Sequence, residues 1–369
     1  MIPRPGAIPG FRRGCARRSS RARVKGRHTA VGAAKPPLLW LRLENEVSAC
    51  PGCRSSRIVL LDAFKIPRDS RGRRVAFLTG CHECGLLFAN PLPSPEELER
   101  YYSQDGGWAA TRKIRATKPP TRPAGQRDPR DILLDALERF IPVHAPPAGA
   151  RVLDFGCGEG RFLDRLRDWG WQTYGIEPST EVAFARHGRL DSPPQDGSFD
   201  LVILHHVLEH VTEPLDILRQ LGGSMREGGT LFIGVPRLDT LPQHGDFKYC
   251  IDGRHHLLCL SEACLRELLA RSGFTVAGRL DEPAFDEQIT RGKPLRLRLV
   301  ATRTQTVAPA MGTPLAPAVQ ALTSYARSSG GLAAAFRGVL PVRVRGARLD
   351  RAIERRARAR RVVKVRSAD

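Results

Sequence analysis

The amino-acid sequence predicts an α/β protein with an open, mostly parallel sheet, preceded by a small cysteine-rich module and flanked by basic segments. Three observations lead to this class. A strand-like stretch at 151–155 runs directly into a glycine-rich turn, strand and helix patterns alternate from there to residue 304, and two Cys-x-x-Cys pairs lie upstream. A chain of 369 residues, 41% of them hydrophobic, is long enough to bury such a core.

The glycine-rich turn is the most informative segment of the chain. Its surroundings read Arg-Val-Leu-Asp-Phe-Gly-Cys-Gly-Glu-Gly-Arg-Phe-Leu from residue 151 to residue 163. The apolar residues before the turn are typical of a central parallel strand, which is covered on both faces. Gly156, Gly158 and Gly160 let the backbone turn sharply and leave no side chain between the main chain and a ligand. We therefore expect a ligand to approach this turn closely, beside Asp154.

Two later segments extend the pattern. Residues 171–179 read as a second strand that ends in Glu177, about 20 positions after the turn, where a carboxylate can accept hydrogen bonds from both hydroxyls of a ribose. Residues 199–211 then read as another strand and the start of a helix, ending in Leu-Glu-His-Val. Three segments in this order are far more specific than one glycine motif alone.

These residues carry a family resemblance. The Gly-x-Gly-x-Gly turn with an Asp two residues ahead resembles motif I of the class I S-adenosylmethionine-dependent methyltransferases, and 199–211 resembles the segment of that family that ends in Leu-Glu-His. The resemblance runs from about residue 50 to residue 303. It implies a Rossmann-like seven-stranded sheet whose last strand is antiparallel, and S-adenosylmethionine as cofactor. The cofactor-binding residues that it implies are Asp154, Gly156, Gly158, Gly160, Glu177, Leu204 and His205.

The segment between Ser179 and Phe199 departs from the family pattern, because it is shorter than the usual helix and third strand. In the family this segment contributes an acid or amide to adenine recognition. Asp191 is the nearest candidate. Elsewhere the pattern predicts strands at 230–236, 275–280 and 295–302, and helices at 131–140 and 261–272, the latter with Ser261 as N-cap.

Four of the nine cysteines form two knuckles separated by 27 residues, and the four are Cys50, Cys53, Cys81 and Cys84. Two such turns can close a tetrahedral cage of four thiolates around zinc, with hairpin strands at 57–64 and 74–79 between them. We expect a structural zinc ion, since four sulfur ligands leave no position for substrate or water. The alternatives are a pair of buried, reduced turns or, less favoured, a redox pair.

The second knuckle and the segment that follows it resemble a module of many bacterial methyltransferases of sugar and natural-product pathways. The matching features are a Cys-x-x-Cys-Gly turn, a Pro-Ser-x-Glu-Glu-Leu helix capped by Ser94, and the pair Tyr101 and Tyr102. In that family the module helps to build the substrate pocket. We expect a zinc-ribbon-like module over 46–102, a linker or lid over 103–130, and the methyltransferase domain over 131–304.

The formal net charge of +21 is concentrated at the two ends of the chain. Residues 1–35 contain ten Lys or Arg and no acid, and 337–369 contain twelve bases and three acids, so the remainder carries only +2. A nearly neutral body is unlike a dedicated nucleic-acid enzyme, so nucleic acid is possible as a partner but not favoured. We expect 1–35 to be a disordered basic tail, with a targeting segment or a wrongly chosen start as alternatives, and 305–369 to be a basic extension.

Three histidines are candidates for a catalytic base. His205 and His206 follow the strand at 199–204, at the edge where open α/β sheets bind ligands, and His256 matches a histidine that precedes a helix in the family. Each has a structural alternative, such as anchoring a loop or capping a helix. A divalent ion held by Glu209 and these imidazoles is conceivable, but no helical His-Glu spacing indicates it, so we expect a metal-free active site.

The sequence therefore favours an enzyme that methylates a small molecule, most simply a sugar, a nucleotide-sugar or a natural-product intermediate. An RNA or protein methyltransferase that recruits its substrate through the module and tails is an alternative, as is a scaffold that keeps the fold without catalysis. No apolar run approaches the length of a membrane span and no secretory signal is evident, so a cytoplasmic protein is expected. The sequence does not indicate an oligomeric state.

Overall fold

The computed structural model describes residues 47–69, 72–102, 127–178, 186–238, 250–251, 255–280 and 296–304. All of them belong to one of the two units into which the chain divides, Leu43–Asp369. The expected tails at 1–35 and 305–369, and residues 103–126 of the expected linker, lie outside the described residues.

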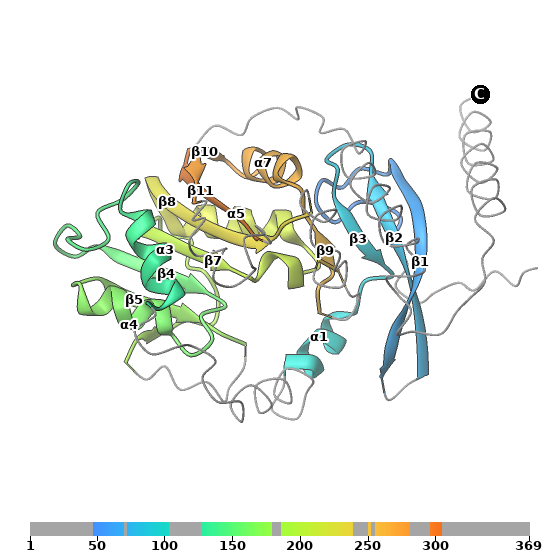
Figure 1. Ribbon diagram of the computed structural model, residues 1–369, viewed down its shortest axis with the longest axis horizontal. Coiled ribbons are helices and arrows are strands. Elements are labelled where there is room, and N and C mark those ends of the chain that lie inside the picture. The colour runs from blue at the N-terminus through green and yellow to red at the C-terminus, as the bar shows by residue number, and fades with distance from the viewer. Residues whose placement is uncertain are drawn as a thin grey trace, which may run out of the picture. The chain divides into compact units, whose positions relative to one another are not determined.

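The larger sheet has seven strands and confirms the predicted α/β class (Figure 1). Six strands run in one direction, and β11 is antiparallel to both of its neighbours, β8 and β10. The strand order is β10 (Phe274–Arg279), β11 (Arg296–Arg303), β8 (Met225–Pro236), β7 (Phe199–His205), β4 (Arg151–Phe155), β5 (Gln172–Ile176) and β6 (Gly188–Arg189).

Helices cover both faces of this sheet. Residues of α3 (Pro129–Leu137) and α4 (Arg161–Asp168) share one apolar cluster with Leu201 and Ile203 of β7. Residues of α5 (Pro214–Ser224) and α7 (Glu262–Arg271) share the other with Val202 and Leu204. Because successive side chains of a strand point to opposite faces, β7 needs apolar residues at each of its central positions, which explains the hydrophobic run 201–204.

The helix starts follow the capping chemistry expected from the sequence. The Ser94 hydroxyl accepts from the Glu97 N–H at 3.3 Å while the Glu97 carboxylate accepts from the Ser94 N–H at 2.9 Å, a capping box that begins α1 (Pro95–Tyr102). Ser261 accepts from the Cys264 N–H at 3.1 Å and begins α7. Asp128, which was not predicted as a cap, begins α3 by accepting from the Arg130 N–H.

A second, four-stranded sheet contains the cysteine-rich module. Its order is β1 (Ile58–Asp69), β2 (Gly72–Cys81), β3 (Leu87–Asn90) and β9 (Leu258–Cys259). The hairpin β1–β2 was predicted, with shorter strands. The fourth strand was not, because β9 belongs to the segment just before α7 and pairs with β3 through Leu87–Cys259 and Phe88–Leu258. The module and the larger domain are therefore joined by strand pairing.

The shortened segment after β5 still supplies an edge strand. β6 contains two residues, and it pairs in parallel with β5 through Tyr174–Gly188 and Gly175–Arg189. Residues 179–185 lie outside the described part of the chain. After β7, the expected start of a helix is a single 3-10 turn, η1 (Leu208–His210), and the helix α5 that follows was not predicted.

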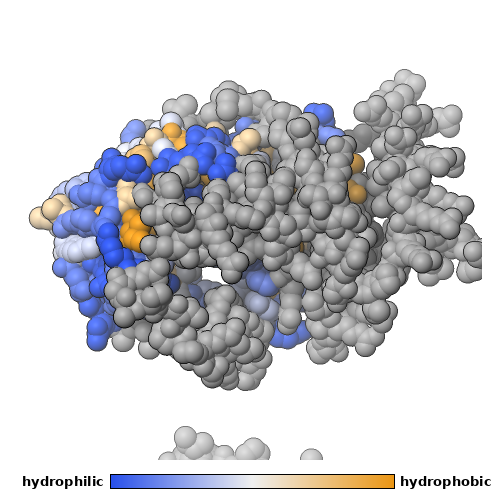
Figure 2. Space-filling view, viewed as in Figure 1, coloured by the Kyte–Doolittle hydropathy of each residue, from blue (hydrophilic) through white to orange (hydrophobic). Residues whose placement is uncertain are grey.

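Among the described residues, no helix combines the length and apolar character that crossing a bilayer requires. On the face shown in Figure 2, the described atoms are mainly hydrophilic, with small hydrophobic areas between them.

The packing of α4 on the sheet gives a test of the fold. Leu163 is completely buried in the cluster that α4 shares with α3, so Leu163→Ala should lower the free energy of unfolding by about 2–5 kcal/mol through lost burial and a residual cavity. Asp168→Ala, on the same helix but with 59% of its side chain exposed, should change it by less than about 0.5 kcal/mol. Urea unfolding followed by circular dichroism measures both, and equal effects would contradict this packing.

Candidate functional site

The turn between β4 and α4 has the backbone geometry that its glycines predict. Gly156, Gly158 and Gly160 have φ values of 78°, 55° and 71°, in the left-handed region that favours glycine. A Cβ added at Gly156 would overlap the side chain of Val207, whereas one added at Gly158 would have no atom within 4 Å. The main chain at Gly158 therefore faces open space.

The carboxylate of Glu177 lies directly beside this turn. Glu177 follows β5, is only 8% exposed, and its Oε2 accepts a hydrogen bond from the Gly158 N–H at 2.9 Å. The N–H groups of Gly156 and Cys157 donate to the Ile176 carbonyl at 2.7 and 3.1 Å, which fixes the turn against the end of β5. The structure thus brings the bare backbone and the acidic side chain together.

Asp154 lies at the end of β4 beneath the turn, with 3% of its surface exposed. Burial raises the pKa of this carboxyl group to about 7, against the lowering effect of the Arg130 guanidinium, and the charge of Glu177 raises it further. Leu204 is completely buried in the core, so only its main chain can face a ligand. Asp191 follows β6 and is exposed.

The two adjacent histidines at the end of β7 occupy different surroundings. The ring of His205 packs against Phe162 and Phe232, with centroid distances of 5.5 and 5.8 Å. Burial lowers the pKa of His205 well below its usual range, so the ring is neutral at pH 7. His206 has a φ of 59° and its Nδ1 lies 2.9 Å from Oε1 of Glu209.

Glu209 is the central residue of a histidine cluster. It is completely buried, and burial alone would raise its pKa, but the hydrogen bond from His206 and the neighbouring imidazoles lower the pKa to about 2. Nδ1 of His210 lies 2.8 Å from the carbonyl oxygen of His255, and burial lowers the pKa of His210 to about 4. The ring of His256 lies 4.8 Å from that of His210.

The structure therefore separates the predicted bases into two groups. His206 and His256 lie in the cluster around Glu209, whereas His205 faces the aromatic side chains next to α4. Tyr101 of α1 completes the cluster, since its ring stacks on His255 at 6.0 Å and His255 stacks on His210 at 5.8 Å. The Tyr-Tyr pair after a capped helix was the sequence signal for this contribution.

The four cysteines of the knuckles converge on one point. Their Sγ atoms lie within 4.8 Å of one another, with Cys50–Cys84 at 3.6 Å and Cys53–Cys81 at 3.5 Å. Hydrogen bonds with neighbouring cysteines, Cys53 first among them, and then burial raise the pKa of Cys50 well above its usual range. Four sulfur atoms so close together can all be ionised only when a cation compensates their charge.

Backbone donors also point at these sulfurs. The Gly52 N–H donates to Cys50 Sγ and the Glu83 N–H donates to Cys81 Sγ, both at 3.3 Å. Such bonds stabilise a thiolate and fix the direction of its lone pairs, so the cluster fits a tetrahedral metal ion.

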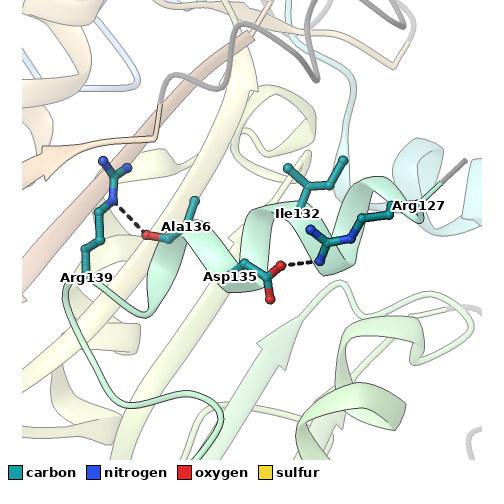
Figure 3. Close-up of a pocket in the computed structure, with 5 residues that line it drawn as sticks. All are labelled: Arg127, Ile132, Asp135, Ala136 and Arg139. Atoms are coloured by element: carbon teal, nitrogen blue, oxygen red, sulfur yellow. Dashed lines mark hydrogen bonds and ion pairs between the residues drawn. The ribbon is translucent and has the colours of Figure 1, made fainter.

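A separate hollow lies along α3 and is lined by Arg127, Ile132, Asp135, Ala136 and Arg139 (Figure 3). Its polar groups contact one another: Arg127 pairs with Asp135, and Arg139 Nε donates to the Ala136 carbonyl at 3.1 Å. None of the predicted site residues lines this hollow, and we assign it no role.

A protein-family model described as a methyltransferase domain matches residues 125–277, which include the turn, Glu177 and the histidine cluster. The strand order and the antiparallel β11 agree with that match. The chain carries a class I S-adenosylmethionine-dependent methyltransferase domain. The family resemblance found in the sequence is thereby confirmed.

Curated relatives match part of the chain. Ubiquinone biosynthesis O-methyltransferase of Xanthomonas axonopodis pv. citri is 33% identical over 127 residues, which cover 30% of this chain and 53% of the relative. The protein of the same name from Xanthomonas campestris pv. campestris (strain B100) has the same identity and coverage. The chain spans about half the length of these curated relatives.

The chain is also similar to a solved methyltransferase structure. The crystal structure of the Burkholderia thailandensis 1,6-didemethyltoxoflavin-N1-methyltransferase with bound 1,6-didemethyltoxoflavin and S-adenosylhomocysteine shares 18% identity. The match covers 66% of this chain and 100% of the Burkholderia thailandensis chain, with a TM-score of 0.42.

The buried Asp154 should make stability depend on pH. Its folded-state pKa of about 7 lies above the ordinary 3.8, so unfolding releases a proton between about pH 4 and pH 7. The contribution of Asp154 to the free energy of unfolding is therefore largest below pH 4 and falls through that interval, at about 1.4 kcal/mol per pKa unit.

Asp154→Asn cannot titrate, so the difference in unfolding free energy between wild type and this variant should decrease by a few kcal/mol from pH 4 to pH 7. Urea unfolding at a series of pH values measures the difference. A difference that stays constant with pH would show that this carboxyl group titrates normally.

Proposed function

We propose that this chain transfers the methyl group of S-adenosylmethionine to a hydroxyl group of a small molecule. The observation that carries the proposal is the contact of the bare Gly158 backbone with the Glu177 carboxylate at the end of the sheet where parallel α/β folds bind ligands. The names of the curated relatives support oxygen as the acceptor atom. A sugar, a nucleotide-sugar or a natural-product intermediate remains the proposed substrate class.

The residues present suit the adenosyl cofactor. Glu177 would accept hydrogen bonds from the ribose hydroxyls, the Gly156–Gly160 backbone would lie against the methionyl part, and the buried Asp154 would support the turn. Asp191 remains the proposed adenine contact, and the main chain of Leu204 and His205 the floor of the pocket. When bound, the cofactor supplies an electrophilic methyl group on a positively charged sulfur.

The chain itself must orient the acceptor and remove its proton. In the transfer, the acceptor oxygen forms a bond to the methyl carbon as the carbon–sulfur bond breaks, which leaves a neutral thioether, and the hydroxyl proton leaves. His206 is placed for this role, because its Nδ1–H donates to the ionised Glu209 and Nε2 is left as a proton acceptor. His206 Nε2 is buried and has no hydrogen-bond partner among the described residues, so the acceptor hydroxyl would have to displace the groups that cover it.

His256 remains a second candidate base, and it lies in the same cluster. His205 is less suited to proton transfer, because its ring packs between aromatic side chains. These roles assign proton movement to the cluster around Glu209 and cofactor contact to the end of β7.

A transfer assay tests the proposed function. Wild type incubated with S-adenosylmethionine labelled in the methyl group, and with a panel of hydroxylated sugars, nucleotide-sugars and phenols, should give a product with the labelled methyl group by mass spectrometry. Glu177→Ala should weaken cofactor binding in calorimetry by about 10- to 100-fold, because it loses hydrogen bonds to a charged acceptor.

Glu159→Ala is the matched control for this measurement. Glu159 lies in the same turn, but its side chain is 53% exposed and pairs with Arg161 at 2.7 Å. The affinity of Glu159→Ala for the cofactor should equal that of wild type. Absence of cofactor binding by wild type, or equal affinities for all three proteins, would contradict the proposed site.

We also propose that the four-cysteine cluster holds a structural zinc ion. The convergence of four sulfur atoms with two N–H···S bonds supports this assignment, and the complete set of sulfur ligands leaves no position for substrate. The ion would fix the turns that precede β1 and β3.

Cobalt substitution tests the zinc site. In wild type, cobalt in the cluster should give the strong near-ultraviolet absorption of cobalt–thiolate bonds, and Cys81→Ser should lose most of this absorption and unfold at a lower temperature. Cys250→Ser, which removes a buried thiol that contacts the Arg237 carbonyl outside the cluster, should keep the absorption. An unchanged spectrum in Cys81→Ser would exclude the cysteine cluster as the site.

A further inference from the structure

A second group of metal-ligating side chains lies outside the cysteine cluster. One ligand atom each of Glu209, His210 and His256 lie within 4.8 Å of one another. Glu209 and His210 belong to η1, and His256 belongs to the segment before β9, which is 46 positions further along the chain. No helical spacing in the sequence indicates this convergence, because it depends on the fold.

The tautomer of His210 is fixed by its surroundings. A carbonyl oxygen can only accept, so Nδ1 of His210 carries the hydrogen that it donates to the His255 carbonyl at 2.8 Å. In the neutral ring, Nε2 therefore carries a lone pair, and it lies 3.8 Å from the Glu209 carboxylate oxygen Oε1. Two hydrogen-bond acceptors that face each other at this distance repel unless a cation lies between them.

The carboxylate of Glu209 also lacks a full set of hydrogen-bond donors. Its Oε1 accepts from His206, whereas Oε2 is buried and has no hydrogen-bond partner among the described residues. Glu209 is completely buried, and a buried carboxylate is costly unless it is paired or bound to a metal. The arrangement supplies an anion and a lone pair, and within the described part of the chain no Lys or Arg pairs with the carboxylate.

The backbone holds this group in place. The Leu257 N–H donates to the Glu209 carbonyl at 2.7 Å, which ties the segment that carries His256 to η1. His206 donates to the Glu209 carboxylate, and His210 donates to the His255 carbonyl. Hydrogen bonds of this type, made by the atoms of a ligand residue that do not bind the metal, fix the orientation of metal ligands.

We propose that Glu209, His210 and His256 bind one divalent transition-metal ion beside the methyl-transfer site. Two imidazoles and one carboxylate leave coordination positions open, and nitrogen ligands favour Zn²⁺, Fe²⁺, Co²⁺ or Mn²⁺ over Mg²⁺. The expectation of a metal-free site rested on linear spacing alone, whereas the fold brings His256 beside Glu209 and His210. On the proposed function, the ion would bind the acceptor oxygen and lower the pKa of its hydroxyl group, with His256 as a ligand and His206 as the base.

Manganese binding to the full-length protein tests this site apart from the zinc site, because thiolate cages select softer ions than Mn²⁺. In electron paramagnetic resonance titrations, wild type should bind one Mn²⁺ per chain, and pulsed measurements should show coupling to imidazole nitrogen. His256→Gln should weaken binding by at least about tenfold. His82→Gln, which removes an exposed histidine of the second knuckle, should bind as wild type does.

Three outcomes would overturn the site: no saturable Mn²⁺ binding, bound Mn²⁺ without nitrogen coupling, or equal affinity in His256→Gln and wild type. The nitrogen coupling is measured on wild type, so the test does not depend on how the variant folds. Metal binding without methyl transfer to any acceptor would leave this site standing and would contradict the proposed function alone. Full transfer by protein freed of this ion would reject its role in the reaction.

Discussion

The backbone after β4 passes through three left-handed residues, and the arrangement of the site depends on this constraint. Glycine adopts these φ values without a steric penalty, and at Gly156 the side chain of Val207 occupies the space that a Cβ would need. The turn thereby packs against the segment after β7 while Gly158 donates to Glu177 after β5. The ends of β4, β5 and β7 meet around one patch of bare backbone.

Backbone hydrogen bonds connect this region to the cysteine-rich module. The N–H of Leu257 donates to the Glu209 carbonyl at 2.7 Å, and the carbonyl of Leu257 accepts from the Ala89 N–H of β3 at 2.9 Å. β3 follows the second knuckle, so the fold of the module and the position of the histidine cluster are mechanically linked. A change in the position of β3 would therefore shift the segment that carries His256 in the proposed acceptor site.

Features encoded locally could be predicted from the sequence, and those that depend on distant contacts could not. The glycine turn, the capping serines and the paired knuckles each lie within a few residues, so their patterns predicted the sheet, the helix starts and the cysteine cluster. The pairing of β9 with β3 joins residues some 170 positions apart. The meeting of His256 with Glu209, and the aromatic surroundings of His205, likewise arise from packing that no linear spacing records.

On this interpretation, one adenosyl cofactor lies between the backbone at Gly158 and the carboxylate of Glu177. A crystal structure of the protein with S-adenosylhomocysteine measures this directly. We expect electron density with the ribose hydroxyls within hydrogen-bond distance of Glu177 and the amino-acid part against the turn that contains Gly158. Density for the ligand at another place on the chain, with the Gly158–Glu177 bond unchanged and no ligand beside it, would show that the cofactor does not bind here.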